Sequence, residues 1–137
     1  MSLNVAGIHH IAIQTSDIDK ALNFYTNVLG AQLLERRKFK KRNFAWLKVG
    51  EVKLELFSAR EDEELEVWRD FYSGPVHIAF TVENLDVFLE AACQHGAQFH
   101  PSHPEPFVPP VPGAGKIAYL IGPDGEEVEI RSASDES

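Results

Sequence analysis

The chain has 137 residues, a formal net charge of -8 and one cysteine, Cys93. The excess of carboxylates disfavours a nucleic-acid partner, and no run approaches the roughly 18 apolar residues of a membrane span, so no membrane partner is expected. A single cysteine excludes an internal disulfide and favours a reducing compartment. With no visible signal peptide, we predict a cytoplasmic protein of one domain, or of two small halves that share a core.

The first part of the chain predicts a strand, a helix and three further strands. β-branched and apolar residues from Ile8 to Thr15 indicate the first strand. Ser16 is the expected N-cap of the helix and Gly30 its stop, because apolar residues recur at helical spacing between them. The remaining strands are expected at about 32–38, 44–49 and 52–58.

Two charge runs of opposite sign follow. Residues 36–42 carry six cations in seven positions, and residues 61–66 carry five anions in six. Each run is interpreted as a solvated surface, although the basic run could instead grip an anionic substrate. Apolar residues at helical spacing predict a linking helix over 60–73: Leu65, Trp68, Phe71 and Tyr72.

The last part of the chain repeats the same order of elements. A strand is expected from Val76 to Val82, then a helix capped by Asn84 and ended by Gly96. Six of the eight prolines lie in residues 101–115, which excludes a helix or a central strand there and leaves either a lid or a plain connector. Further strands are expected at about 97–100, 116–121 and 126–131.

Short sequences recur in the same order in the two parts. His10-Ile-Ala-Ile13 returns as His77-Ile-Ala-Phe80, and Leu54-Glu-Leu-Phe57 matches Val128-Glu-Ile-Arg131. Two copies indicate a duplicated supersecondary unit rather than a solenoid. The predicted fold class is therefore α+β, with two tandem β-α-β-β-β modules that form a curved mixed sheet around a metal-binding cavity. The predicted modules are 6–58 and 76–133, joined by the linker 59–75.

Strand alternation places one metal-capable residue of each repeated strand opposite its apolar neighbours. These four residues are His10, Glu55, His77 and Glu129. If a pseudo-twofold axis relates the modules, the four meet around one divalent metal ion. Two imidazoles and two carboxylates suit Zn, Ni, Co, Mn or Fe, and both a closed tetrahedral site and an octahedral site with open positions remain consistent with them. The candidate substrate-binding residues on the same faces are Gln14, Phe57, Thr81 and Arg131.

These motifs, together with Phe24-Tyr-Thr-Asn-Val-Leu-Gly30 and Gly122-Pro-Asp-Gly125, resemble the vicinal oxygen chelate superfamily over residues 6–133. The ligand pattern is most similar to the glyoxalase I (lactoylglutathione lyase) branch. The resemblance implies that His10, Glu55, His77 and Glu129 hold the metal. It further implies a lyase or isomerase that moves a proton next to a carbonyl through a metal-stabilised enediolate, with Glu129 as first candidate for the base and Glu55 as second.

The same resemblance implies a homodimer and a small carbonyl or hydroxyacyl substrate. The site would lie within one chain or across two. Gln14 stands where the glyoxalase I pattern has an arginine that grips the glutathione carboxylate, and Ala59 stands where it has an asparagine. Both departures remove partners of a charged tripeptide, so the substrate need not be linked to glutathione.

Three alternatives remain. A methylmalonyl-CoA epimerase-like enzyme would use the same chemistry, with residues 36–42 meeting CoA phosphates. An Fe(II) dioxygenase is disfavoured because Glu55 would crowd the oxygen site. A non-catalytic drug-binding resistance protein is disfavoured because all four metal-capable residues are retained.

Overall fold

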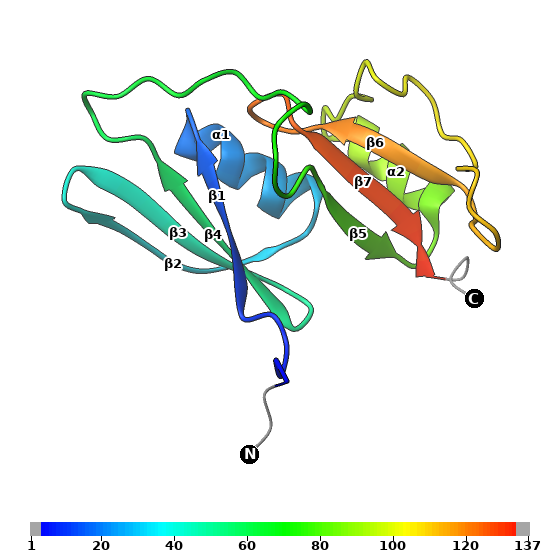
Figure 1. Ribbon diagram of the computed structural model, residues 1–137, viewed down its shortest axis with the longest axis horizontal. Helices are drawn as coiled ribbons and strands as arrows, with labels where there is room; N and C mark the ends of the chain where they lie inside the picture. The colour runs from blue at the N-terminus through cyan, green and yellow to red at the C-terminus, as the bar shows by residue number, and fades with distance from the viewer. Residues whose placement is uncertain (1–3, 134–137) are drawn as a thin grey trace. The chain divides into compact units, whose positions relative to one another are not determined.

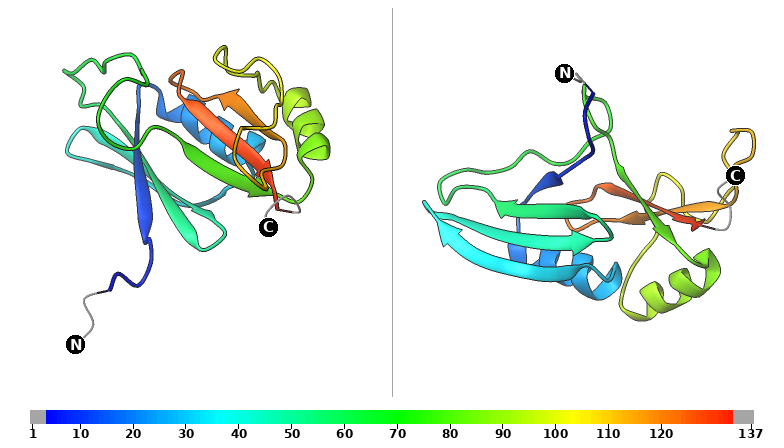
Figure 2. Two further views of the ribbon diagram at one scale, coloured as in Figure 1. Left: turned by 45° about the vertical axis from the view of Figure 1, so that its right-hand side comes forward. Right: turned by 90° about the horizontal axis from the view of Figure 1, so that it is seen from below.

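The computed structural model describes residues 4–133, and the first of its two compact units ends at Leu65 while the second begins at Glu66. In each unit a helix covers one face of a small mixed sheet (Figures 1 and 2). This arrangement confirms the predicted α+β class with two modules. Within residues 4–133, no helix is long and apolar enough to cross a membrane. The exact module boundaries at 58 and 76 stay predictions.

The sheet of the first unit has the strand order β1-β4-β3-β2. Strand β1 (His10–Thr15) runs parallel to β4 (Val52–Ser58), and β3 (Arg42–Val49) pairs antiparallel with both β4 and β2 (Gln32–Phe39). The strands therefore lie close to where the alternation of apolar residues placed them. The core side chains of β3 and β4 are fully buried beneath the helix: Ala45, Leu47, Leu54 and Leu56.

The helix of the first unit differs from the prediction at its start and in the form of its last turns. Helix α1 (Ile18–Asn23) begins after Asp17 rather than Ser16, because the Asp17 carboxylate accepts a hydrogen bond of 3.1 Å from the Lys20 backbone N–H. A carboxylate at this position also interacts favourably with the helix dipole. The chain then widens into the π-helix η1 (Phe24–Val28). Gly30 ends the turn at a φ of 77°, as predicted.

The sheet of the second unit has the order β5-β7-β6. Strand β5 (Ile78–Val82) runs parallel to β7 (Glu127–Ser132), which pairs antiparallel with β6 (Ile117–Ile121). Helix α2 (Leu85–Gln94) is capped by Asn84 as predicted, whose side chain accepts from the Val87 N–H at 3.0 Å.

The strand predicted at 97–100 is wrong. Only an isolated bridge between Phe99 and Leu120 forms in this stretch. Pro101 follows directly, and a proline cannot donate to a strand ladder, so the pairing ends after one residue.

The helix predicted over 60–73 is also wrong, because this segment consists of turns, bends and irregular chain. Phe71 and Tyr72 are 76% and 49% exposed, so half of the stripe that suggested a helix has no apolar surface to cover it. Like charges three and four residues apart within 61–66 disfavour a helix there further. Of the apolar residues in the segment, Trp68 packs its ring edge against His100 at 5.5 Å.

The proline-rich segment 101–115 is anchored rather than paired along its length. The backbone groups of Phe107 and Ile117 exchange two hydrogen bonds, of 2.9 and 2.8 Å. This bridge holds the segment against β6, at the side of the second sheet where Glu129 lies.

Candidate functional site

The first unit places His10 and Glu55 on one face of its sheet. In the parallel β1–β4 ladder Ala12 lies opposite Glu55, so His10 is one step from Glu55 along the same face. Leu54 and Leu56 are buried on the other face, as the alternation predicts. The Nδ1 atoms of His9 and His10 lie 2.8 Å apart. A hydrogen bond there engages the Nδ1 side of His10, which makes Nε2 the nitrogen to offer to a metal.

The second unit repeats this geometry. In the β5–β7 ladder Ala79 lies opposite Glu129, and His77 precedes Ala79 by two residues, as His10 precedes Ala12. The His77 Nε2 and Glu129 Oε1 atoms are 3.4 Å apart. The internal repeat therefore copies the position of each histidine relative to its glutamate as well as the residue types.

Each pair has an aromatic neighbour that the sequence reasoning missed. Trp46 lies opposite Glu55 and contacts the His10 ring edge-on at 5.0 Å. Tyr119 lies opposite Glu129 and contacts the His77 ring edge-on at 5.3 Å. A signal was present, because Ala-Trp-Leu at 45–47 recurs as Ala-Tyr-Leu at 118–120.

The two glutamates have different surroundings. Glu55 is half-buried, whereas Glu129 is only 8% exposed and accepts a hydrogen bond of 3.0 Å from the Tyr119 hydroxyl. Burial, this hydrogen bond and the nearby carboxylates of Glu129 and Glu127 together raise the pKa of Tyr119 to about 12. At neutral pH the Tyr119 hydroxyl therefore stays protonated and can donate its hydrogen bond to Glu129.

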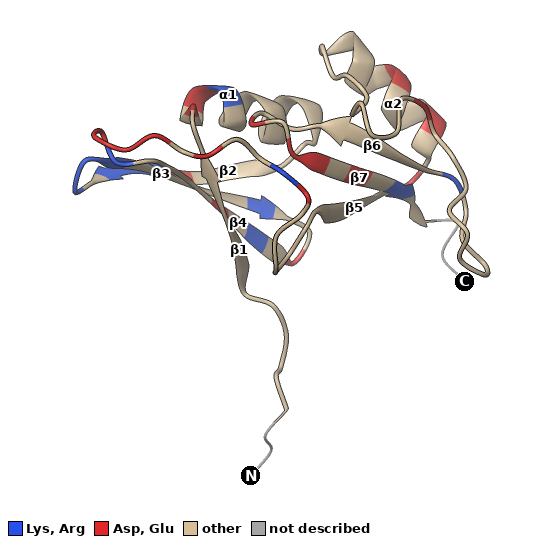
Figure 3. Cartoon of the chain, turned by 45° about the horizontal axis from the view of Figure 1, so that its top comes forward, with Lys and Arg blue, Asp and Glu red and all other residues tan. Residues whose placement is uncertain are grey.

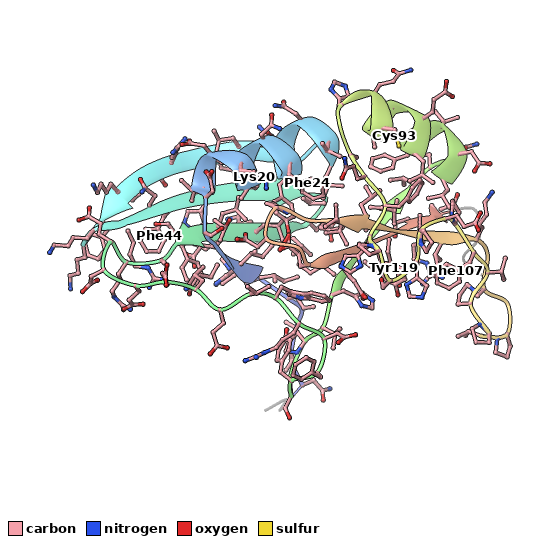
Figure 4. All side chains as sticks on the ribbon, turned by 90° about the horizontal axis from the view of Figure 1, so that it is seen from above. Lys20, Phe24, Phe44, Cys93, Phe107 and Tyr119 are labelled. Atoms are coloured by element: carbon pink, nitrogen blue, oxygen red, sulfur yellow. The ribbon has the colours of Figure 1, made fainter. Side chains whose placement is uncertain are left out.

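A cavity of about 390 Å³ lies beside Glu129 in the second unit. The cavity has the volume of a small-molecule site. Arg131 and Tyr119 line it together with Glu129, and its opposite wall comes from the proline-rich segment. The His103 ring stacks on both Phe107 and Tyr119, with ring centroids 4.5 and 4.8 Å away, and Figure 4 shows the labelled Phe107 and Tyr119 near each other. The segment 101–115 is thus a wall of this cavity and more than a plain connector.

The predicted substrate-binding residues also form equivalent pairs. Gln14 lies opposite Phe57 in the first ladder, and Thr81 lies opposite Arg131 in the second. Each pair is one step beyond its glutamate on the same face. Of these four residues, Arg131 lines the cavity.

The structure brings the metal-capable residues together as two pairs, one in each unit. Within residues 4–133 no group of three or more His, Cys, Asp or Glu side chains is arranged to hold a metal ion. Each pair offers an imidazole nitrogen and a carboxylate oxygen, the donors that first-row divalent metals prefer. The chemistry of the pairs therefore fits such an ion, while a single site made of all four residues stays a prediction.

Comparison with known proteins establishes the family. The model of the glyoxalase/bleomycin resistance protein/dioxygenase superfamily matches residues 7–130, and the chain belongs to this superfamily. The resemblance predicted from the His-Ile-Ala and Glu motifs is confirmed.

Relatives of known type include two kinds of enzyme. A lactoylglutathione lyase of Salmonella typhimurium is 27% identical, with 92% of this chain and 92% of the relative covered. A metallothiol transferase FosB of Shouchella clausii is also 27% identical, with 95% of this chain and 82% of the relative covered. Among solved structures, a glyoxalase family protein from Enterococcus faecalis has a TM-score of 0.77 and 26% identity, and the match covers 92% of this chain and 97% of that one.

Proposed function

We propose that the protein is a metal-dependent, glyoxalase I-like lyase or isomerase that transfers a proton next to a carbonyl group. The observation that carries this proposal is the repeated His–Glu pair, found at the same ladder position in both units. A cavity beside the more buried glutamate gives a small substrate a place to bind. A lactoylglutathione lyase among the relatives supports the reaction class.

Four residues would hold the metal: His10, Glu55, His77 and Glu129. A divalent ion bound there supplies a Lewis acid, which lowers the cost of negative charge developing on the substrate oxygens. The donor set is compatible with Zn, Ni, Co, Mn or Fe.

Glu129 is the proposed base. Its carboxylate borders the cavity, and the Tyr119 hydroxyl fixes one of its oxygens. In the reaction the C–H bond next to the carbonyl breaks, the proton moves to Glu129, where it can exchange with solvent, and Glu129 then delivers a proton to the neighbouring carbon. No proton is gained or lost overall. Glu55, which has no tyrosine in the equivalent place, is the second candidate.

The proposed substrate is a small carbonyl or hydroxyacyl compound that need not carry glutathione. Stacked rings of His103 and Phe107 wall the cavity and suit an apolar or planar group, while Arg131 offers a cation. Gln14 and Ala59 do not supply the charged and amide partners expected for a glutathione arm. A cytoplasmic homodimer remains part of the proposal, and light scattering of the purified protein would test the dimer.

A solvent-exchange experiment would test the reaction. The purified protein, loaded in turn with Zn, Ni, Co, Mn and Fe(II), is incubated in D₂O with hydroxypyruvate and with the hemithioacetals that methylglyoxal forms with glutathione and with 2-mercaptoethanol. We expect metal-dependent loss of the proton next to the carbonyl in the NMR spectrum, and it should not require the glutathione adduct. Absence of bound metal under all five conditions would refute the proposal.

Glu129→Gln is the decisive variant and Glu127→Gln its matched control. Both glutamates are buried in β7, but Glu127 has Lys53 rather than a glutamate as its counterpart in the first ladder. We expect Glu129→Gln to lose at least a hundredfold in exchange rate, in line with removal of a general base, and Glu127→Gln to lose far less. Equal rates in Glu129→Gln and wild type would exclude Glu129 as the base.

A further inference from the structure

The cations of the basic run 36–42 differ in whether they form ion pairs. Arg36 forms an ion pair of 2.8 Å with Asp19, Arg37 pairs with Glu35, and Lys38 lies 3.4 Å from Glu61. These three side chains are thereby neutralised by carboxylates at or near the surface. Figure 3 shows the remaining basic residues at the turn between β2 and β3, where Arg42 begins β3.

Arg42 is held firmly without a carboxylate. Its Nε–H donates to the Ser58 carbonyl at 2.9 Å, and its Nη2 donates to the Gln14 side-chain oxygen at 3.3 Å. The guanidinium carbon lies 4.4 Å from the centroid of the Phe57 ring and 5.9 Å from that of Phe44. No ion pair of Arg42 is present among residues 4–133. A guanidinium also has more N–H donors than these two hydrogen bonds use.

Arg42 shares a sheet face with Glu55. Phe44 lies opposite Phe57, and Trp46 lies opposite Glu55, so alternate residues of β3 face the same way as Glu55. Phe57 follows Glu55 by two residues, which places the stacked guanidinium about 7 Å further along the strand direction. The first unit therefore presents a His–Glu pair and, one ladder step beyond it, a fixed cation.

We propose that Arg42, oriented by Gln14 and stacked on Phe57, binds the oxyanion group of the substrate. The geometry selects a small carbonyl or hydroxyacyl compound that carries a carboxylate or phosphate group about 7 Å from the oxygens near the His–Glu pair. A planar guanidinium donates two parallel hydrogen bonds to either kind of oxyanion. An anion bound here would neutralise the positive charge of Arg42, which forms no ion pair with a described carboxylate. The substrate assignment rests on the proposed function, whereas binding of an anion at Arg42 does not.

Binding is tested on the full-length protein without turnover. Pyruvate and inorganic phosphate are titrated separately while NMR follows the Arg42 Nε–H signal and the backbone signals of Gln14 and Phe57. We expect one of the two probes to shift these signals in a saturable way. Saturation with pyruvate alone indicates a carboxylate substrate, and saturation with phosphate alone indicates a phosphate ester. Saturation with neither probe would overturn the proposal, even if the proton-transfer reaction were established.

Two variants separate binding from a purely structural role of Arg42. Arg42→Lys keeps the charge but loses the planar fork, and Arg42→Gln loses both. We expect at least tenfold weaker probe binding in Arg42→Gln and an intermediate loss in Arg42→Lys, because hydrogen bonds to charged groups are lost. Arg37→Gln is the matched control, since that cation already pairs with Glu35. Unchanged probe binding in a folded Arg42→Gln protein would contradict the proposal.

Discussion

Tyr119→Phe removes one oxygen atom from the site and leaves the ring. The hydroxyl donates to Glu129 Oε1 at 3.0 Å, and both residues are 8% exposed. A hydrogen bond to a charged group contributes about 1.5–3 kcal/mol, and losing it here leaves a buried carboxylate with one donor fewer. We therefore expect the unfolding free energy of the metal-free protein to fall by about 1.5–3 kcal/mol, which corresponds to roughly 4–12 °C in Tm for a chain of this size.

Urea unfolding at pH 7 followed by circular dichroism measures this loss. Tyr72→Phe is the control, because its hydroxyl donates to the neutral carbonyl of Pro75 in an exposed position. That variant should lose about 1 kcal/mol or less. Equal losses in the two variants would refute the argument that the Tyr119–Glu129 hydrogen bond is special.

The stability difference between wild type and Tyr119→Phe should also depend on pH, with a sign that follows from the pKa of Tyr119. The pKa of Tyr119 is raised to about 12 from an ordinary value of 10.0, so folding favours the neutral phenol. Its contribution to stability is fully present below pH 10 and is lost as the pH rises through 12. The stability difference between wild type and Tyr119→Phe should therefore shrink above pH 10. A tyrosinate absorbance near pH 10 that disappears in Tyr119→Phe would show that this pKa assignment is wrong.

Three further predictions concern the cap, the core and the metal pair. Asp17→Ala should cost about 1 kcal/mol of unfolding free energy, measured in urea, whereas Lys20→Ala, which removes no capping side chain, should cost less; the reverse order would contradict the Asp17 cap. Leu56→Ala empties a fully buried position beneath α1 and should cost about 2–5 kcal/mol in urea unfolding, the ordinary range for such cavities. His77→Ala should lower metal affinity at least tenfold in a competition titration while His95→Ala, at the end of α2, should not; equal affinities would remove His77 from the ligand set.

Strand positions were predictable because alternation leaves a mark on single residues. Ile11 and Ile13 are more buried than Ala12 between them, and the paired strand shows the same pattern at Leu54 and Leu56 around Glu55. The repeat then transferred the assignment from one module to the other. The start of α2 was likewise predictable, because the Asn84 cap depends on a local hydrogen bond and not on tertiary structure.

The errors lie where tertiary contacts decide. The apolar stripe of 60–73 satisfies helical spacing, but Phe71 finds no surface to cover it, and spacing alone cannot supply one. The strand predicted at 97–100 is reduced to the Phe99–Leu120 bridge, because the adjacent Pro101 cannot donate to a strand ladder. The cavity wall depends on stacking of His103 and Phe107 against Tyr119 of β6, a contact distant in sequence that no local pattern encodes.

Duplication preserved positions in the two modules while their surroundings diverged. Glu55 and Glu129 occupy the same ladder site, yet an indole stands opposite one and a phenol opposite the other. The phenol of Tyr119 donates to its carboxylate, and a cavity lies beside the glutamate of the second unit. The first unit instead carries the fixed guanidinium of Arg42. If both proposals hold, each module supplies one histidine and one glutamate to the metal. The second module then carries out proton transfer, and the first recognises an anionic group of the substrate.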